Sequence, residues 1–463
     1  MNGALLGMLG YVLVQFAIGA WVSRRMASET DYILAGRSLG AGLVAFSVFA
    51  TWFGAEAITV SAGEVYDKGL SGATVDPFGY AAAVLVVGVL LAGRLWRGGY
   101  VTYADMFRER FSPGVEQLFV IMLLPGSILW AAAQIRAFGQ VISSSSGMSV
   151  TTAITLAAVL VAGYSVVGGL LADAITDVVQ GLAVIIGLIV LAVTIVLAAG
   201  GLGASLQHVT PERLDMLRGA ESPLLRLEQL AITICGSIVA VELVSRFLGA
   251  RSAQAARNGT VIGGLLYLAV GCIPIFLGLV GPRFVPGLSE PEQIVSKLAQ
   301  QFMPVFGYTM FAGALISAIL STVHSALHAP AAQVSHNIVL RLLPGLGPRE
   351  RLLSVRLTVL GLSLVAFILA LSVTRIRDLV ELASAFGTAG AFVTALFAVF
   401  TRIGGASSAY AAMLGGMATW SIGKFGFGIS APYLKAIGVS AFVYVLVAVV
   451  EKQKQDAIVK QPS

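Results

Sequence analysis

The chain has 463 residues, of which 57% are hydrophobic and 11% are charged, and its formal net charge is +6. Soluble domains carry about 25% charged residues, so this composition excludes a soluble globular protein and indicates one that crosses a membrane many times. The basic excess does not indicate a nucleic-acid partner, because the basic residues lie in short loops between apolar segments, where they encode topology. We therefore expect the lipid bilayer to be its main surroundings.

Windows of about 20 apolar residues predict thirteen membrane-spanning helices and no large soluble domain. The predicted spans are residues 3–23, 40–66, 75–96, 116–142, 149–167, 172–199, 227–248, 256–282, 303–340, 353–374, 378–401, 406–424 and 430–451. The chain is thus predicted to be an all-α polytopic membrane protein. The first span is interpreted as an uncleaved helix. The ninth is long for one crossing, which predicts a strong tilt or an extension beyond the membrane.

Lysine and arginine are concentrated in alternate loops, which the positive-inside rule makes cytoplasmic. This predicts an N-terminus outside and a C-terminus in the cytoplasm. The bases are Arg24, Arg25 and Arg37; Arg94, Arg97, Arg108 and Arg110; Arg246, Arg251 and Arg257; Arg341, Arg349 and Arg351; and Lys452, Lys454 and Lys460. The loop 97–115 is polar with an amphipathic middle, which predicts a short helix at the membrane surface. A composition rich in Ala, Gly, Val and Arg suggests a bacterium, so we expect the inner membrane of the cell.

The segment Ser47–Asp67 is as hydrophobic as a membrane helix, but Glu56, Glu64, Gly54 and Gly63 interrupt it. An ionisable group at membrane depth costs about 2.5–3.5 kcal/mol even on the insertion scales. A helix whose backbone opens around a cavity has a use for such residues. The alternative is a plain spanning helix with a paired glutamate and packing glycines.

Other polar residues inside the predicted spans form further groups. They are Trp130 with Gln134; Asp173 with Asp177; Glu242, six residues after Gly236; and Ser317, Ser321, Thr322, His324 and Ser325. Residues four apart share one face of a helix. Hydroxyl, carbonyl and carboxylate oxygens are the ligands that a hard cation such as sodium prefers.

Each of these groups also has a plain structural interpretation. Serine and threonine in membrane helices bond to their own backbone or pack between helices. Asp177 can serve in a structural pair, Trp130 in core or lipid packing, and His324 is interpreted as a core histidine rather than a ligand. No spacing indicates a zinc or haem site or a Ser–His–carboxylate arrangement, so we expect no enzyme activity and no metal other than sodium.

Four segments in order resemble the sodium:solute symporter family, the relatives of the sodium/glucose cotransporters. They are DYILAGRSLG at 31–40, FATWFGAEAITVSAGEVY at 49–66, YSVVGGLLADAITDVVQ at 164–180 and ISAILSTVHSA at 316–326. The resemblance, over about residues 31–400, implies a LeuT-type fold, in which two inverted repeats of five core helices surround a midplane site and the first and sixth core helices are broken. The expected segments are an N-terminal helix and loop (1–30), the first repeat (31–200), an extracellular loop (201–226), the second repeat (227–403), two C-terminal helices (404–451) and a cytoplasmic tail (452–463).

The resemblance also implies a sodium site and an unwound helix around Ala50–Gly54. The sodium ligands of relatives fall on the carbonyl groups of Ala50, Phe53 and Ala318 and on the hydroxyl groups of Ser321 and Thr322. Some relatives bind a second sodium ion between an aspartate and a serine, which fall on Asp177 and Ser325. Val323 and His324 stand where many relatives have small or acidic residues, so His324 is placed to perturb this second site.

Within the family, ATW-x-G, GYVT at 99–102, WAAA at 130–133 and TDVVQ at 176–180 are most similar to the high-affinity choline transporter branch. That branch surrounds a quaternary ammonium with aromatic rings, a cation–π arrangement. Trp52, Tyr80 and Trp130 match three of its aromatic positions. A further cage tryptophan falls near Ala240 here, with Glu242 beside it, so the chain departs from the branch at that position.

The resemblance implies a sodium-coupled symporter that imports a small organic solute, either an amine, a choline-like or an amino-acid-like molecule, by alternating access. The expected substrate-binding residues are Trp52, Glu56, Tyr80, Trp130, Gln134 and Glu242. For Glu56, capping the freed amides of the broken helix is an equal alternative. The expected partners are the solute, sodium and the bilayer, and the expected functional unit is a monomer. The alternative function is a solute sensor that uses the symporter fold without sodium-driven accumulation.

Overall fold

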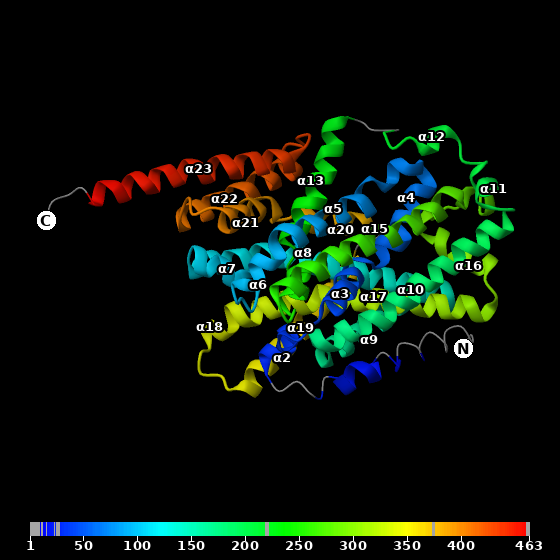
Figure 1. The fold of residues 1–463 in the computed structure, drawn as a ribbon, viewed down its shortest axis with the longest axis horizontal. Helices are drawn as coiled ribbons and strands as arrows, with labels where there is room; N and C mark the ends of the chain where they lie inside the picture. The colour runs from blue at the N-terminus through cyan, green and yellow to red at the C-terminus, as the bar shows by residue number, and fades with distance from the viewer. Residues whose placement is uncertain are drawn as a thin grey trace.

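The computed structural model describes residues 10, 13–14, 16–22, 24, 28–217, 222–372 and 376–459. These residues form helices joined by short loops, with no β-strand among them beyond one isolated bridge between Leu39 and Ala250. In Figure 1 the long helices run roughly along the longest axis of the molecule. Much of the predicted first span, and the end of the predicted tail, lie outside the described residues.

Every predicted span from residue 40 onward falls on one helix or on a pair of helices. In chain order they are α3 (Ala41–Trp52) with α4 (Ser61–Lys68), α5 (Tyr80–Val86) with α6 (Gly93–Arg97), α8 (Pro113–Ser146), α9 (Val150–Val167), α10 (Leu170–Ala198), α13 (Pro223–Val239) with α14 (Val241–Leu248), α15 (Ala253–Phe284), α17 (Val305–Gln333), α19 (Pro348–Ser372), α20 (Ile376–Ala385) with α21 (Thr388–Phe400), α22 (Ala406–Ser421) and α23 (Pro432–Val459). Nine helices of the described chain are long and apolar enough to cross a membrane, or ten if the bent pair α13–α14 is one span.

Shorter helical segments connect or extend these helices. They are α2 (Glu29–Leu34), η1 (Ala35–Arg37), η2 (Glu56–Val60), η3 (Gly69–Ala73), η4 (Thr74–Gly79), η5 (Val87–Ala92), α7 (Tyr103–Arg110), α11 (Leu202–Leu206), α12 (Pro211–Leu214), η6 (Pro291–Gln293), α16 (Ile294–Phe302), η7 (Val334–Val339), α18 (Leu340–Leu342) and η8 (Ile422–Gly426). Helix α7 confirms the short helix predicted in the loop 97–115. The predicted ninth span is one continuous helical run, Val305–Leu342, of 38 residues.

Serine side chains cap the starts of several long helices. Ser112, Ser149, Ser222 and Ser252 each accept a hydrogen bond from a first-turn amide of α8, α9, α13 and α15 respectively. These caps satisfy backbone donors that have no partner within the helix. Proline follows Ser112 and Ser222, at a helical position that needs no amide hydrogen. The sequence thus defines where these helices begin.

In each half of the described chain, a break interrupts a helix beside the core. Helix α3 ends at Trp52, Phe53 has the non-helical angles φ −84° and ψ 59°, and helical structure resumes with η2. In the second half, Ala240 has φ −63° and ψ 116°, and α13 and α14 are bent by 40°. The first break lies at the position that the resemblance implies.

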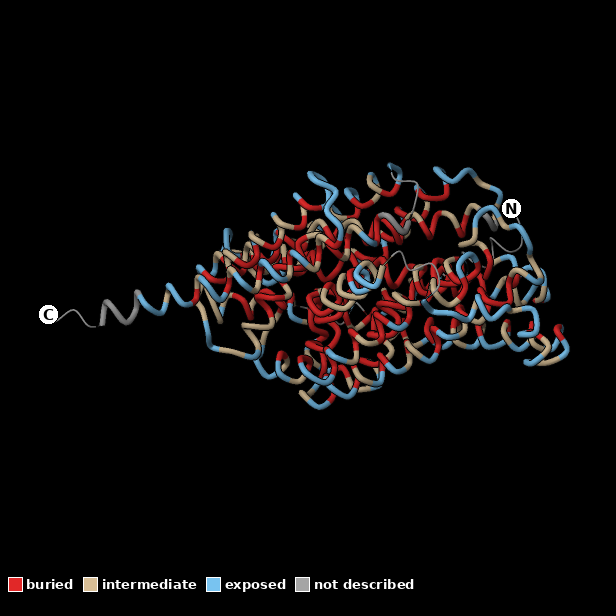
Figure 2. Tube along the Cα trace, turned by 90° about the horizontal axis from the view of Figure 1, so that it is seen from above, coloured by how far each residue is buried: buried red, intermediate tan, exposed pale blue. Residues whose placement is uncertain are grey.

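Gly54 allows the first break to pack closely against α17. A Cβ atom on Gly54 would lie 2.7 Å from Thr322 Oγ1, which is too close for any side chain. Around the break, α3 packs against α10, α15 and α17. Figure 2 shows that the buried residues fill the middle of the bundle and that exposed residues lie on its outer surface.

The connecting segments separate into two ends of the bundle. In Figure 1, α11, α12 and α16 lie at one end, while α7 and α18 lie at the other, beyond which α23 extends. The predicted extracellular loop 201–226 and the predicted cytoplasmic loop 97–115 therefore lie at opposite ends. Helix α7 itself begins with a capping box between Thr102 and Asp105.

Candidate functional site

Three of the five predicted sodium ligands, Ala50, Ala318 and Thr322, meet where the break in α3 contacts α17. The Thr322 Oγ1 atom lies 3.0 Å from the carbonyl oxygen of Ala50 and 3.1 Å from that of Ala318. Phe53 is the residue at which α3 ends, Ser321 precedes Thr322 on α17, and all five residues are buried. The atoms that converge here are carbonyl and hydroxyl oxygens, the ligand type that suits a hard cation. The residues present therefore fit a sodium ion.

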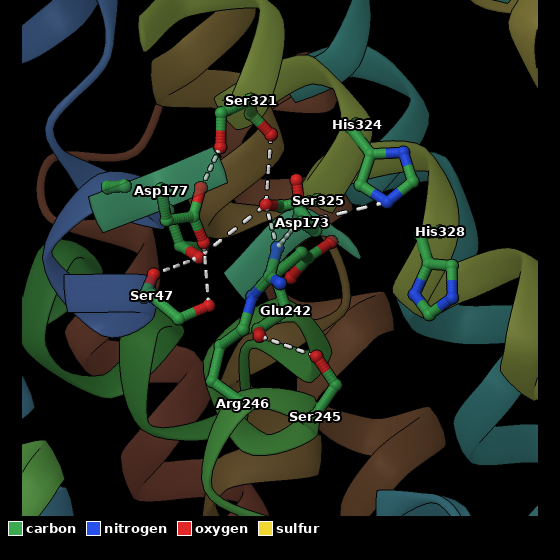
Figure 3. A network of polar contacts seen from close by, with 12 residues as sticks. Ser47, Asp173, Asp177, Glu242, Ser245, Arg246, Ser321, His324, Ser325 and His328 are labelled. Atoms are coloured by element: carbon green, nitrogen blue, oxygen red, sulfur yellow. Dashed lines mark hydrogen bonds and ion pairs between the residues drawn. The ribbon is translucent and has the colours of Figure 1, made fainter. Parts of the chain in front are cut away.

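Asp177, the first member of the predicted second pair, lies beside this site on α10. Its carboxylate accepts a hydrogen bond from Ser47 Oγ at 2.7 Å and another from Ser321 Oγ. Ser325, the second member, donates its hydroxyl hydrogen to the carbonyl oxygen of Ser321 at 3.0 Å. Figure 3 shows these side chains from α3, α10 and α17 facing one another in a single polar network. The structure thus places both predicted residues around Ser321.

Arg246 enters the same network, and its interpretation as a base of a cytoplasmic loop is wrong. It lies on α14, is 1% exposed, and its Nη2 atom is 2.6 Å from Asp173 Oδ2. The same guanidinium donates a hydrogen bond to Ser325 Oγ. Because α13 and α14 bend at Ala240, the second half of the broken helix enters the core, which a count of loop charges does not detect.

Two histidines of α17, His324 and His328, lie near Asp173. His324 Nε2 is 3.8 Å from Asp173 Oδ2, and neither ring nitrogen of His324 has a hydrogen-bond partner among the described residues. The rings of His324 and His328 stack with centroids 5.2 Å apart, and His328 Nε2 lies 3.1 Å from the carbonyl oxygen of Tyr32. His324 is therefore a buried histidine, but it lacks the hydrogen bond expected of a satisfied core residue.

Trp52, Tyr80 and Trp130 form an aromatic cluster next to the break in α3. The Trp52 ring centroid lies 5.2 Å from that of Tyr80 and 5.4 Å from that of Trp130. The three residues come from α3, α5 and α8, so only the tertiary structure brings them together. Trp52 Nε1 is buried without a hydrogen-bond partner in the described chain.

A small cavity of about 60 Å³ lies against the aromatic cluster. Trp52, Tyr80, Trp130, Ser127 and Glu242 are among its lining residues, and so is Ala240. Ser127 Oγ donates a hydrogen bond of 2.6 Å to Glu242 Oε1, which fixes the carboxylate at the edge of the cavity. At Ala240, where the resemblance places a tryptophan in relatives, the small side chain leaves space. Glu242 is the one charged residue in the described lining.

A larger cavity of about 850 Å³ adjoins the small one, because Tyr80 and Ser384 line both. Its wall includes acidic and basic residues and part of the loop 201–226. The charged residues are Glu56, Glu64, Asp67, Asp76, Glu381, Lys68, Arg213 and Arg226. The acidic side chains outnumber the basic ones, and Lys68 pairs with Glu64 at 2.5 Å. The larger cavity is thus an acidic chamber that leads toward the predicted extracellular end.

Glu56 and Gln134 have different surroundings, although both are predicted substrate residues. Glu56 lines the larger cavity, and its Oε1 atom accepts a hydrogen bond of 3.0 Å from the Tyr80 hydroxyl. Gln134 is 1% exposed, and its Oε1 atom accepts a hydrogen bond of 3.3 Å from the amide of Ala55. Gln134 lines neither cavity. It accepts from an amide freed by the break in α3, which is the capping role that was considered for Glu56.

Asp76 is a residue that the sequence analysis missed. It is 6% exposed, lines the larger cavity, and accepts a hydrogen bond of 2.7 Å at Oδ1 from the Tyr267 hydroxyl. Its Oδ2 atom has no hydrogen-bond partner among the described residues. The sequence feature that could have indicated Asp76 is its position as an ionisable residue at the start of the predicted span 75–96, directly before Pro77.

The chain is similar to several known transporters. It is 24% identical over 398 residues to the high-affinity choline transporter 1 of Caenorhabditis elegans, a match that covers 80% of this chain and 68% of that protein. It is 25% identical over 380 residues to the sodium/pantothenate symporter of Escherichia coli strain K12, with 79% and 78% of the two chains covered.

The fold is similar to that of a solved transporter. A sodium-coupled sialic acid symporter in a substrate-bound, outward-open state superimposes with a TM-score of 0.86, at 15% identity, over 96% of this chain and 98% of that one. This likeness shows the LeuT-type fold. The profile of the sodium:solute symporter family matches residues 32–416. The chain therefore belongs to the sodium:solute symporter family, whose members are transporters rather than enzymes.

Proposed function

We propose that this protein imports a small solute that carries a positively charged amine, choline-like or amino-acid-like, together with sodium. The observation that carries the proposal is the aromatic cluster of Trp52, Tyr80 and Trp130, which has Glu242 at one side and Glu56 at the other. The similarity to a choline transporter supports the same class of solute.

The physical reason is the charge of this environment. An ammonium group over an aromatic face gains about 0.5–2 kcal/mol or more when it is desolvated. Glu242 adds a buried carboxylate that Ser127 holds in place, and the described lining of the small cavity includes no basic residue. A sugar site would use several side-chain amides, and the described lining of the small cavity has hydroxyl groups but no Asn or Gln, so a cation or a zwitterion fits better.

The larger cavity supplies the access route in this proposal. It reaches from Tyr80 to the loop 201–226, at the end opposite α7. We take that end as extracellular and the α7 end as cytoplasmic, in agreement with the loop charges. The chain then has an outward-facing conformation, and its acidic wall raises the local concentration of sodium and of a cationic solute. The functional unit is proposed to be a monomer.

Coupling is proposed to arise at the contact between α3 and α17. A sodium ion held by Ala50, Ala318 and Thr322 links the two helices and thereby favours the outward-facing state. Trp52 lies on the same broken helix, so solute and sodium both depend on its conformation. Each ligand promotes binding of the other only if both favour the same state. Separation of α3 from α17 then releases the sodium ion toward the cytoplasm.

The proposal is tested first by thermal shift and then by uptake. Purified protein is heated in NaCl or in KCl of equal ionic strength with choline, other amines, amino acids, pantothenate and sugars. We expect sodium-dependent stabilisation by one of the amines or amino acids, and sodium-gradient-driven accumulation of that solute in proteoliposomes. Stabilisation by sugars alone would contradict the solute class. Binding without accumulation would favour the sensor function instead.

A further inference from the structure

We propose that the guanidinium of Arg246 occupies the position of a second cation, so that this transporter binds one sodium ion per chain. The inference rests on the proposed sodium coupling and concerns the pair Asp177 and Ser325. The resemblance in sequence implies a second sodium site between these two residues. Here a covalently attached cation already contacts one member of the pair and compensates a neighbouring carboxylate, Asp173.

The first argument is the use of the Ser325 hydroxyl. Its hydrogen is donated to the carbonyl oxygen of Ser321 at 3.0 Å, and its oxygen accepts a hydrogen bond from Arg246 Nη2. The Thr51 hydroxyl approaches the same oxygen at 3.5 Å. A sodium ion at this position would share the Ser325 oxygen with the guanidinium, whose positive charge would repel it. Figure 3 shows the Arg246 side chain reaching into the network toward Ser325 and Asp173.

The second argument concerns Asp177. One of its carboxylate oxygens accepts from Ser47 and the other from Ser321, and the residue is fully buried. Both oxygens therefore have donors without a second ion. The hydrogen bond from Ser321, the neighbour of Thr322 on α17, places the Asp177 charge next to that first site rather than at an independent one.

The third argument is the balance of charge. Asp173 and Asp177 contribute two negative charges and Arg246 one positive charge, and all three are 0–1% exposed. Buried charges are stable only when they are compensated. With the two carboxyl groups ionised and His324 and His328 neutral, the cluster keeps one negative charge. One sodium ion at the contact between α3 and α17 neutralises it, whereas a second would leave a buried excess of positive charge.

The consequence is mechanical as well as electrostatic. Arg246 belongs to α14, Asp173 to α10 and Ser325 to α17, so the guanidinium joins the second broken helix to two other core helices. A sodium ion at this point would leave in each transport cycle, but the side chain cannot. Arg246 therefore stays at this contact throughout the transport cycle, and only the distances to its partners on α10 and α17 change.

The test counts the sodium ions that bind. Purified wild-type protein is titrated with radioactive sodium at constant ionic strength, and thermal stability is measured along the same titration. We expect one ion per chain at saturation. Two ions would overturn the inference while leaving sodium coupling intact. No bound sodium would overturn the proposed coupling and the inference with it.

Variants test the role of the guanidinium directly. Arg246→Ala leaves two carboxylates uncompensated, so we expect the count to rise from one ion to two; a folded variant that still binds one ion would overturn the inference. The variant Arg246→Ala with Asp173→Asn keeps the net charge of the wild type and is expected to bind one ion. If Arg246→Ala does not fold, this double variant tests the inference instead, since two sodium ions bound to it would contradict the charge balance. Arg251→Ala removes an exposed arginine and is the matched control, which should bind one ion.

Discussion

The side chain of Thr322 contacts the backbone of Ala50, although 272 residues separate them in the chain. The hydroxyl oxygen of Thr322 lies 3.0 Å from the carbonyl oxygen at the end of α3 and 3.1 Å from that of Ala318, one turn earlier on α17. In the absence of an ion, one hydroxyl hydrogen serves both carbonyl groups. A cation in this place would satisfy the three oxygens together, which is the physical basis of the proposed coupling.

Thr322→Ala is expected to weaken sodium binding about tenfold, because a lost oxygen ligand is worth roughly 1–1.5 kcal/mol. The measurement is the sodium concentration that gives half-maximal uptake or thermal stabilisation. Thr322→Ser keeps the hydroxyl and should behave like the wild type. An unchanged sodium dependence in Thr322→Ala would remove this residue from the site.

Gly54→Ala is expected to destabilise the protein by about 1–3 kcal/mol through overpacking. Its Cβ would lie 2.7 Å from Thr322 Oγ1, so either α17 or the break in α3 must move. The sodium affinity should fall with the stability, since the displaced atoms are proposed ligands. Gly42→Ala, on α3 before the break, meets no atom within 4 Å and is the control. Equal melting temperatures for the two variants would contradict the close packing.

Glu242→Gln is expected to reduce the affinity for a positively charged solute about tenfold to a hundredfold, since a hydrogen bond to a charged group is worth roughly 1.5–3 kcal/mol. The glutamine can still accept the hydrogen bond from Ser127, so the fold should be retained. Glu381→Gln, at the wall of the larger cavity, is the control with an exposed carboxylate. The measurement is the concentration of solute at half-maximal uptake; equal losses in both variants would argue against a specific role of Glu242.

Glu292→Gln is expected to be more stable than the wild type, and this gain in stability should be larger at neutral pH than at acidic pH. Glu292 lies in η6, between the predicted spans, where burial and the nearby Glu64 and Glu290 raise the pKa of its carboxyl group above 4.5. A raised pKa means that the folded state favours the protonated form, so wild-type stability falls as the pH rises through the interval between the ordinary and the raised value.

The measurement is the melting temperature of Glu292→Gln and of the wild type over a pH series from about 4 to 7. The advantage of the variant should grow with pH. Glu290→Gln, which removes only one repelling neighbour, should give a smaller effect in the same direction. A difference that is constant across the series would show that Glu292 does not titrate in this way.

Residues 47–67 show how much of the site the sequence predicts. Two glutamates and two glycines in an apolar segment indicated a helix that opens, and α3 does end at Trp52. The resemblance also pointed to the hydroxyl group of Thr322, which does meet the carbonyl oxygen of Ala50; its role as a sodium ligand stays a prediction. The role of Gln134 was not, since its contact with the amide of Ala55 depends on how α8 passes the break.

Arg246 and Asp76 show what sequence reasoning could not reach. The loop-charge pattern favoured a cytoplasmic position for Arg246, because the rule assigns bases near the end of an apolar span to the surface. The bend at Ala240 directs α14 into the core instead. Asp76 required knowledge of its partner Tyr267 on α15, a residue far away in the chain.

The sequence by itself determined the class of protein, the positions of its spans from residue 40 onward and the family, because hydropathy and motif order are local properties of the chain. Hydrophobic length sets where a helix can cross a bilayer whatever its neighbours are. Only the tertiary structure decided which polar groups meet: Thr322 with Ala50, Arg246 with Asp173 and Ser325, and Trp52 with Tyr80 and Trp130. These contacts join residues of different helices, and the energy of a buried charge or hydroxyl depends on the partner that packing brings to it.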